Sequence, residues 1–231
     1  MKITLWSLPR TGSTYLYNML VKYLFNTSLQ KQFKYHKLNL NEFSKNYSES
    51  DLFNILNNEN RWVVKDLLIG TNASESVYEY FNHNSDKIYL TLRKDWFQMI
   101  SSASLAHITN EWSAGKTYQA KTAEISLDLF FKKFNIFWEL LNKNIKFINV
   151  DKIIFYEDLK FWIRKDLVHL GLIDNIEDIK PLKSYTNKLK SKKDTILNYN
   201  VLYEFYNTIN LNNYTSEYFY FDSQKKLQYK K

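Results

Sequence analysis

The sequence contains no cysteine, and only four glycines and two prolines among its 231 residues. Without cysteine the chain forms neither disulfides nor thiolate metal sites, so a disulfide-stabilised secreted class gains no support. So few Gly and Pro argue against an all-β architecture, which needs many tight turns. The four histidines are also little material for a metal centre, and we expect no metal cofactor.

Long apolar runs are missing as well. None approaches the ~18–20 residues that a membrane-spanning helix needs, so we expect no membrane span. Residues 1–9 have the character of a short strand and lack the long apolar core of a signal peptide. We therefore expect a cytoplasmic protein. Hydrophobic residues make up 45% of the chain, which is enough for a full core.

Positive charge is in excess, with 32 Lys and Arg against 24 Asp and Glu and a net charge of +8. This balance suits a polyanionic partner such as a nucleotide, a nucleic acid or a sulfated glycan. A compositional bias toward Lys, Asn and Tyr would explain the charge equally well. The rare arginines are therefore more informative than the lysines, and there are four of them: Arg10, Arg61, Arg93 and Arg164.

Apolar runs alternate with amphipathic segments along the chain. We predict strands at residues 3–8, 61–65, 87–92, 145–150 and 153–156, and helices at residues 13–24, 51–57, 95–106, 125–141, 159–170 and 196–209. This alternation predicts an α/β fold with a mainly parallel central sheet flanked by helices. We expect a single domain over residues 1–221, a polar and frayed tail at 222–231, and a loop at 107–124 that is long enough to act as a lid.

Residues 9–14, Pro-Arg-Thr-Gly-Ser-Thr, join the first strand to the first helix and have the composition of an anion-binding turn. Gly12 allows the backbone to approach a ligand closely. Ser13 and Thr14 add hydroxyls at a helix N-terminus, where free N–H groups already favour an anion, and Arg10 adds a fixed positive charge. An ordinary capped turn would explain Ser13, but not Arg10 and Gly12 together. The kinase and ATPase pattern G-x-x-x-x-G-K-[ST] does not fit, because Gly12 lacks both the earlier Gly and the following Lys.

The same six residues resemble the 5′-phosphosulfate loop of sulfotransferases that use 3′-phosphoadenosine 5′-phosphosulfate (PAPS), P-[KR]-[ST]-G-[ST]-T, at every position. The arginine at position 10 is similar to the tyrosylprotein and bacterial branches. The resemblance implies a P-loop-like sulfotransferase fold, with PAPS as donor and adenosine 3′,5′-bisphosphate (PAP) as product. It also implies cofactor-binding roles for the residues of this loop: Arg10, Thr11, Gly12, Ser13 and Thr14.

The residues that follow the third predicted strand resemble a second motif of this family. The family places an Arg after this strand and a Ser eight residues later, and together they hold the 3′-phosphate; Arg93 and Ser101 have this spacing. A salt bridge between Arg93 and Asp95 is the alternative. The sequence Tyr-Glu-Asp-Leu at 156–159 resembles a family segment that implies an adenine contact for Tyr156. Tyr15 stands where another branch has an adenine-stacking Trp, although either tyrosine could instead belong to the core.

Residues 61–66 resemble the family's second strand, which implies that Lys65 lies near the transferred sulfuryl group. One branch has a catalytic His two residues after that Lys, but this chain has Leu67, which cannot move a proton. The candidate bases are, in order of preference, His36, Asp66 and Glu42, with His83 as a further possibility. The basic residues of 188–193 stand where the family has a mobile loop over the nucleotide, or form a solvated run of charge: Lys188, Lys190, Lys192 and Lys193.

The resemblance thus implies sulfuryl transfer from PAPS to a hydroxyl or amine by in-line displacement, with Arg10, Lys65 and either His36 or Asp66 as catalytic residues. The acceptor is open among glycan, lipid, peptide and small molecule, and no nucleic-acid partner is expected. Three alternatives remain: a nucleotide or nucleoside kinase, a non-catalytic nucleic-acid-binding module, and a family member that binds nucleotide without catalysis.

Overall fold

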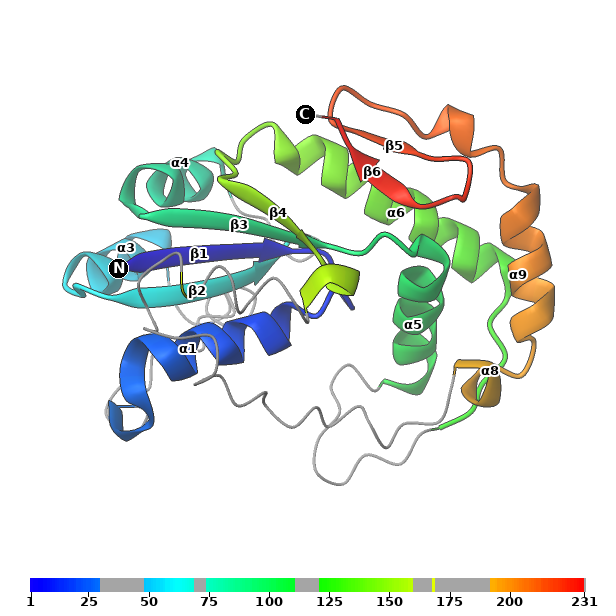
Figure 1. The fold of residues 1–231 in the computed structure, drawn as a ribbon, viewed down its shortest axis with the longest axis horizontal. Coiled ribbons are helices and arrows are strands. Elements are labelled where there is room, and N and C mark those ends of the chain that lie inside the picture. The colour runs from blue at the N-terminus through cyan, green and yellow to red at the C-terminus, as the bar shows by residue number, and fades with distance from the viewer. Residues whose placement is uncertain (30–47, 69–73, 111–120, 160–167, 169–191, 231) are drawn as a thin grey trace. The chain divides into compact units, whose positions relative to one another are not determined.

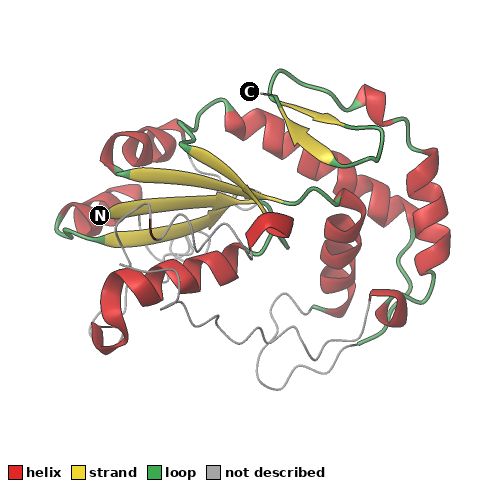
Figure 2. Ribbon diagram, viewed as in Figure 1, coloured by secondary structure: helices red, strands yellow, loops and turns green. Residues whose placement is uncertain are grey.

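The computed structural model describes residues 1–29, 48–68, 74–110, 121–159, 168 and 192–230. The chain divides into two compact units. The first comprises Met1–Leu92 and Lys143–Leu182, and the second comprises Arg93–Asn142 and Lys183–Lys231. The first unit is built on a sheet, whereas the second is mainly helical and ends in a β-hairpin (Figures 1 and 2).

A four-stranded parallel sheet in the order β2-β1-β3-β4 forms the centre of the first unit. Its strands are β1 (Lys2–Ser7), β2 (Trp62–Leu67), β3 (Lys87–Leu92) and β4 (Lys152–Phe155). The chain passes from β1 to β2 on one side and then crosses to β3 on the other, so β1 is a central strand where the strand order reverses. The predicted α/β class with a parallel central sheet flanked by helices is confirmed.

Helices cover both faces of this sheet, because side chains alternate along each strand. Ile3 and Leu5 point into a cluster formed with α1 (Ser13–Leu29). Trp6 points the other way and packs on α4 (Glu75–Asn84), with ring centroids 5.0 Å from Tyr78 and 5.8 Å from Phe81. The helix α3 (Glu49–Asn57) packs on α4, and the short 3-10 helix η1 (Tyr156–Asp158) follows β4.

The second unit has an aromatic core around Trp96. The centroid of its ring lies 5.3 Å from the ring centroid of Phe134, 5.9 Å from that of Trp138 and 5.3 Å from that of Phe221. Its helices are α5 (Trp96–Thr109), most of α6 (Leu127–Ile145), α8 (Lys192–Thr195), α9 (Tyr199–Thr208) and the 3-10 helix η4 (Leu211–Asn213). The strands β5 (Phe219–Phe221) and β6 (Leu227–Tyr229) form its antiparallel hairpin.

Two predictions from sequence were wrong around the long helices. The strand expected at 145–150 does not form: α6 continues to Ile145, because Phe137, Leu141 and Ile145 recur at helical spacing and are all buried. The loop expected at 107–124 begins later than predicted, since α5 reaches Thr109 and ends at the left-handed Asn110. The central part of that loop, 111–120, lies outside the described residues.

The frayed tail expected at 222–231 was also wrong. Residues 222–230 belong to the β5–β6 hairpin, and Leu227 is fully buried within it. The boundary predicted at residue 221 therefore falls inside a folded element. The sequence gives no clear strand signal here, because β6 is three residues long and only one of its residues is buried. The helix predicted at 159–170 lies almost wholly outside the described residues.

Candidate functional site

The loop that the sequence predicts to bind an anion lies at the carboxyl end of β1 (Figure 1). β1 ends at Ser7 and α1 begins at Ser13, so residues 8–12 form the connection. In open α/β sheets, ligands bind outside the carboxyl ends of the strands, at the point where the strand order reverses. The topology therefore puts the motif at the edge of the sheet where a ligand site is expected.

Two residues give this loop its shape. Arg10 has a φ of 65° and Gly12 a φ of 74°, so both are left-handed. A left-handed turn curls successive N–H groups toward one side, which is how a chain builds an anion-binding concavity. The left-handed conformation is ordinary for Gly12 but uncommon for an arginine. The strain at Arg10 indicates that the surrounding fold imposes this conformation.

The N-terminus of α1 completes the turn. The carbonyl of Gly12 accepts hydrogen bonds from the amides of Tyr15 at 2.9 Å and Leu16 at 3.1 Å. The amides of Ser13 and Thr14 precede these first helical bonds, at the end of the helix that carries the positive pole of its dipole. Ser13 is buried and Thr14 is exposed. This is the local arrangement in which main-chain donors favour a phosphate or sulfate group.

The structure brings Lys65 to the same place. β2 pairs with β1 in parallel, and Lys65 on β2 lies opposite Leu5. Its Nζ donates a hydrogen bond to Thr14 Oγ1 at 2.8 Å, across 51 positions of sequence. The fold thus brings the lysine of β2 to the loop after β1, and its predicted place near a transferred sulfuryl group stays a prediction. An ammonium group here adds to the positive field of the helix N-terminus.

Tyr156 also reaches the loop. A Cβ placed on Gly12 would lie 2.6 Å from Tyr156 Cδ2 and 2.8 Å from Leu159 Cδ1, so the two side chains press directly against the glycine. The Tyr156 side chain is nevertheless exposed, whereas Leu159 is buried. Tyr15 is half-buried and packs against the hydrophobic cluster between α1 and the sheet.

The hydroxyl of Thr11, which was predicted to bind the cofactor, faces inward. It is fully buried, donates a hydrogen bond to the carbonyl of Leu8 at 2.7 Å, and lies 3.1 Å from Thr91 Oγ1. Thr91 is itself fully buried on β3. The Thr11 side chain therefore supports the loop from within. Sequence reasoning missed Thr91, and its only signal was a hydroxyl inside an apolar strand.

The candidate bases have different outcomes. His83 lies at the C-terminal end of α4, which leads into the start of β3, at the edge of the sheet opposite the loop. The structure therefore does not bring His83 to the loop after β1. Asp66 lies on β2 next to Lys65, but its side chain is outside the described residues. His36 and Glu42 are outside them altogether, as are Lys188 and Lys190.

Arg93 and Ser101 belong to the second unit. Arg93 follows the last residue of β3 directly in the chain, and its side chain is half-buried. Ser101 lies on α5 and is fully buried, and its hydroxyl has no hydrogen-bond partner among the described residues. The Ser104 hydroxyl, one helical turn further on, is in the same situation. Asp95 caps α5 and forms an ion pair with Lys226 at 2.7 Å.

In the part of the chain that the structure describes, no three His, Asp or Glu side chains gather as metal ligands would. Across the same residues, no helix is both long enough and apolar enough to pass through a bilayer.

Comparisons with known proteins add little to this geometry. No family model and no curated protein sequence matches the chain. Among solved structures, the chain is similar to a protein described as "Sulfotransferase Domain from the Curacin Biosynthetic Pathway", with a TM-score of 0.41 and 15% identity over 82% of this chain and 78% of that one. A likeness this distant carries no argument about function. What stands is a parallel α/β fold with a basic, left-handed turn at the N-terminus of its first helix.

Proposed function

We propose that this chain is a sulfotransferase that transfers the sulfuryl group of PAPS to a hydroxyl or amine acceptor. The observation that carries the proposal is the turn after β1. There, the left-handed Arg10 and Gly12, the N-terminus of α1 and the Lys65 ammonium belong to one compact group of residues. The six residues 9–14 also fit the 5′-phosphosulfate pattern at every position.

The proposed reaction is an in-line displacement at sulfur. The acceptor oxygen or nitrogen forms a bond to sulfur while the bond from sulfur to the bridging oxygen breaks, and that oxygen keeps the electron pair as PAP leaves. Arg10 and the amides of Ser13 and Thr14 stabilise the charge that grows on the leaving oxygen. Lys65 neutralises the transferred group, and a base removes the acceptor proton.

Other assignments rest on the sequence pattern alone. Arg93 and Ser101 bind the 3′-phosphate, since a guanidinium suits a doubly charged phosphate. Tyr15 and Tyr156 contact the adenine. His36 is the preferred base, followed by Asp66 and then Glu42.

A ligand-stabilisation experiment tests the function. PAP should raise the melting temperature with or without a chelator, because a ligand that binds only the native state stabilises it by mass action. At about 100 times Kd the gain is ~2.7 kcal/mol, or a shift of about 5–10 °C for a chain of this size. ATP with Mg²⁺ should give a much smaller shift, and adenosine serves as the control without phosphate.

Each alternative predicts a different result. An equal or larger shift with Mg-ATP would favour a kinase. A shift with oligonucleotides that collapses steeply with salt would favour a nucleic-acid-binding module. Binding of PAP without transfer from labelled PAPS to any acceptor in a broad panel would favour a non-catalytic binder.

A further inference from the structure

The C-terminal hairpin is fastened to the segment that follows Arg93. The amide of Leu227 on β6 donates to the carbonyl of Lys94 at 3.0 Å. The Nζ of Lys226 donates to Asp95 Oδ2 at 2.7 Å. These two bonds fall on the two residues directly after Arg93, although about 130 residues of sequence separate the partners.

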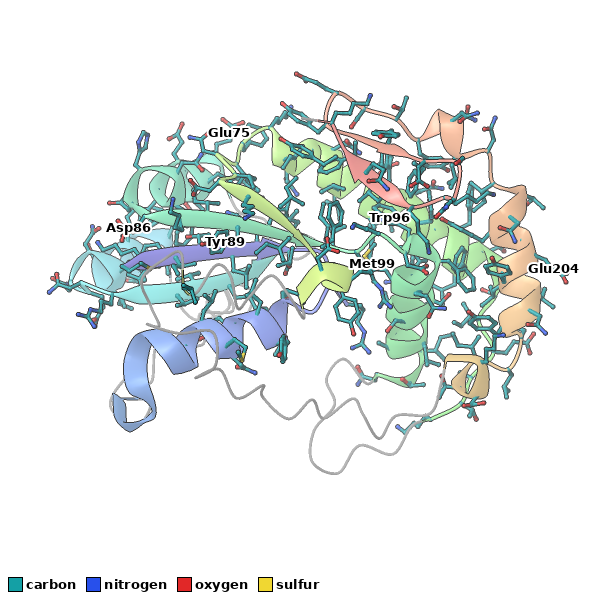
Figure 3. All side chains as sticks on the ribbon, in the orientation of Figure 1. Glu75, Asp86, Tyr89, Trp96, Met99 and Glu204 are labelled. Atoms are coloured by element: carbon teal, nitrogen blue, oxygen red, sulfur yellow. The ribbon has the colours of Figure 1, made fainter. Side chains whose placement is uncertain are left out.

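Asp95 links this attachment to the helix behind it. Its Oδ1 accepts the amide of Gln98 at 3.0 Å and thereby caps α5, while its Oδ2 is taken by Lys226. Both carboxylate oxygens are thus occupied. Trp96, the first residue of α5, is fully buried and packs edge-on against Phe221 of the hairpin (labelled in Figure 3). An exposed ion pair contributes little by itself, but this one belongs to a network that includes a helix cap, a main-chain bond and a buried aromatic contact.

The hairpin turn that presents Lys226 is itself well fixed. Asp222 Oδ1 accepts the amide of Lys226 at 2.9 Å. The neighbouring Lys225 is left-handed, with a φ of 58°, and its Nζ donates to carbonyls at the end of α9, the shortest bond being 2.7 Å to Asn207. Lysine at a helix C-terminus satisfies carbonyls that the helix leaves unpaired. The Lys226 ammonium is therefore held by a rigid support.

We propose that Lys226 is a positioning residue that sets the preference for nucleotides with a 3′-phosphate. Lys226 holds Lys94 and Asp95 in one conformation and thereby fixes the backbone next to Arg93 within the second unit. A preorganised arginine loses less conformational entropy when it binds a phosphate. The inference rests on the proposed function, which assigns the 3′-phosphate to Arg93.

The test compares two lysine variants of the hairpin. Lys226→Met removes the ammonium and keeps the aliphatic chain. Lys230→Met is the matched control, because it removes the same charge from a lysine of the hairpin whose Nζ donates to Thr215 Oγ1 and to the carbonyl of Ser216 and not to Asp95. Calorimetry gives the Kd of PAP and of adenosine 5′-monophosphate for each protein. In Lys226→Met the ratio of the Kd of the monophosphate to the Kd of PAP should fall about threefold to tenfold, with the Kd of the monophosphate unchanged. Lys230→Met should keep the wild-type ratio of the two Kd values.

A second variant guards against loss of folding. Asp95→Asn keeps a good helix cap but loses the charge that Lys226 meets, and it should lower the preference by a similar factor. The double variant should lower the preference for PAP no further than either single variant, because each substitution removes the same ion pair between Lys226 and Asp95. If the wild type does not prefer PAP over the monophosphate, the assignment of Arg93 fails and this inference falls with it. If the wild type prefers PAP and Lys226→Met keeps that preference in full, the inference alone is overturned.

Discussion

Gly12→Ala is the change that probes the loop most directly, because Gly12 meets two separate requirements. Its φ of 74° is a conformation that L side chains rarely adopt. Its missing Cβ also leaves room for Tyr156 Cδ2 and Leu159 Cδ1, which would lie 2.6 and 2.8 Å from a methyl group. We expect the variant to fold less stably and to lose binding of PAP.

The magnitude follows from the two terms. A left-handed alanine costs about 1–2 kcal/mol. Forcing a methyl into a filled site costs about 1–3 kcal/mol more. Tyr156 is exposed and can turn aside, but Leu159 is 5% exposed and is held by the core, so the steric term does not vanish. The total expected loss in the free energy of unfolding is about 2–5 kcal/mol.

Urea denaturation measures this loss, and Tyr156→Ala provides the second arm of a double-mutant cycle. In the Tyr156→Ala background, Gly12→Ala should cost less, because part of the overlap is gone while the backbone strain persists. The reasoning is refuted if Gly12→Ala costs under ~1 kcal/mol, since the backbone term alone predicts more. A cost that is identical in both backgrounds would show that Tyr156 does not press on the loop.

Two further predictions concern the same turn. Arg10→Ala should lower turnover about 10²–10³-fold with a much smaller effect on the Kd of PAP, because the charge that Arg10 meets is greatest in the transition state. Arg10→Lys should recover part of the lost rate. Unchanged turnover of Arg10→Ala in an assay with PAPS would refute the proposed catalytic role of Arg10. Thr91→Val removes a fully buried hydroxyl that lies 3.1 Å from Thr11 Oγ1, and should lower the free energy of unfolding by about 1–3 kcal/mol. Thr91→Ser should restore most of this stability, and denaturation curves that rank Val and Ser alike would contradict the hydrogen-bonded pair.

The fold and the loop were predictable because their signals are local. Strand β1, the turn and the start of α1 lie within the first two dozen residues, where apolar periodicity and one glycine suffice to place them. The contact of Lys65 with Thr14 was not predicted, since 51 residues separate the two and no local pattern joins them; the family resemblance implied only that Lys65 lies near the transferred sulfuryl group. The parallel direction of the strands followed from the alternation of strands and helices, whereas their order in the sheet was not predicted.

The errors came from segments whose state depends on distant partners. β6 is three residues long and mostly polar, so nothing local distinguishes it from a frayed end; its pairing with β5 and the burial of Leu227 hold it in place. The prediction at the end of α6 was wrong for another reason. Ile145 could belong to a strand or to a helix, and the buried Leu141 four residues earlier places it on the buried face of the helix.

The left-handed Arg10 connects these observations. A glycine at position 10 would adopt a φ of 65° without strain, whereas an arginine there costs about 1–2 kcal/mol. Such strain persists only where the surroundings fix the backbone, and here they do so from several elements. Thr11 bonds to Leu8 and lies against Thr91 of β3, and Gly12 is covered by the start of η1. A loop that is supported from within at this cost fixes the backbone at Arg10, and a fixed backbone is what its proposed role of meeting a developing negative charge requires.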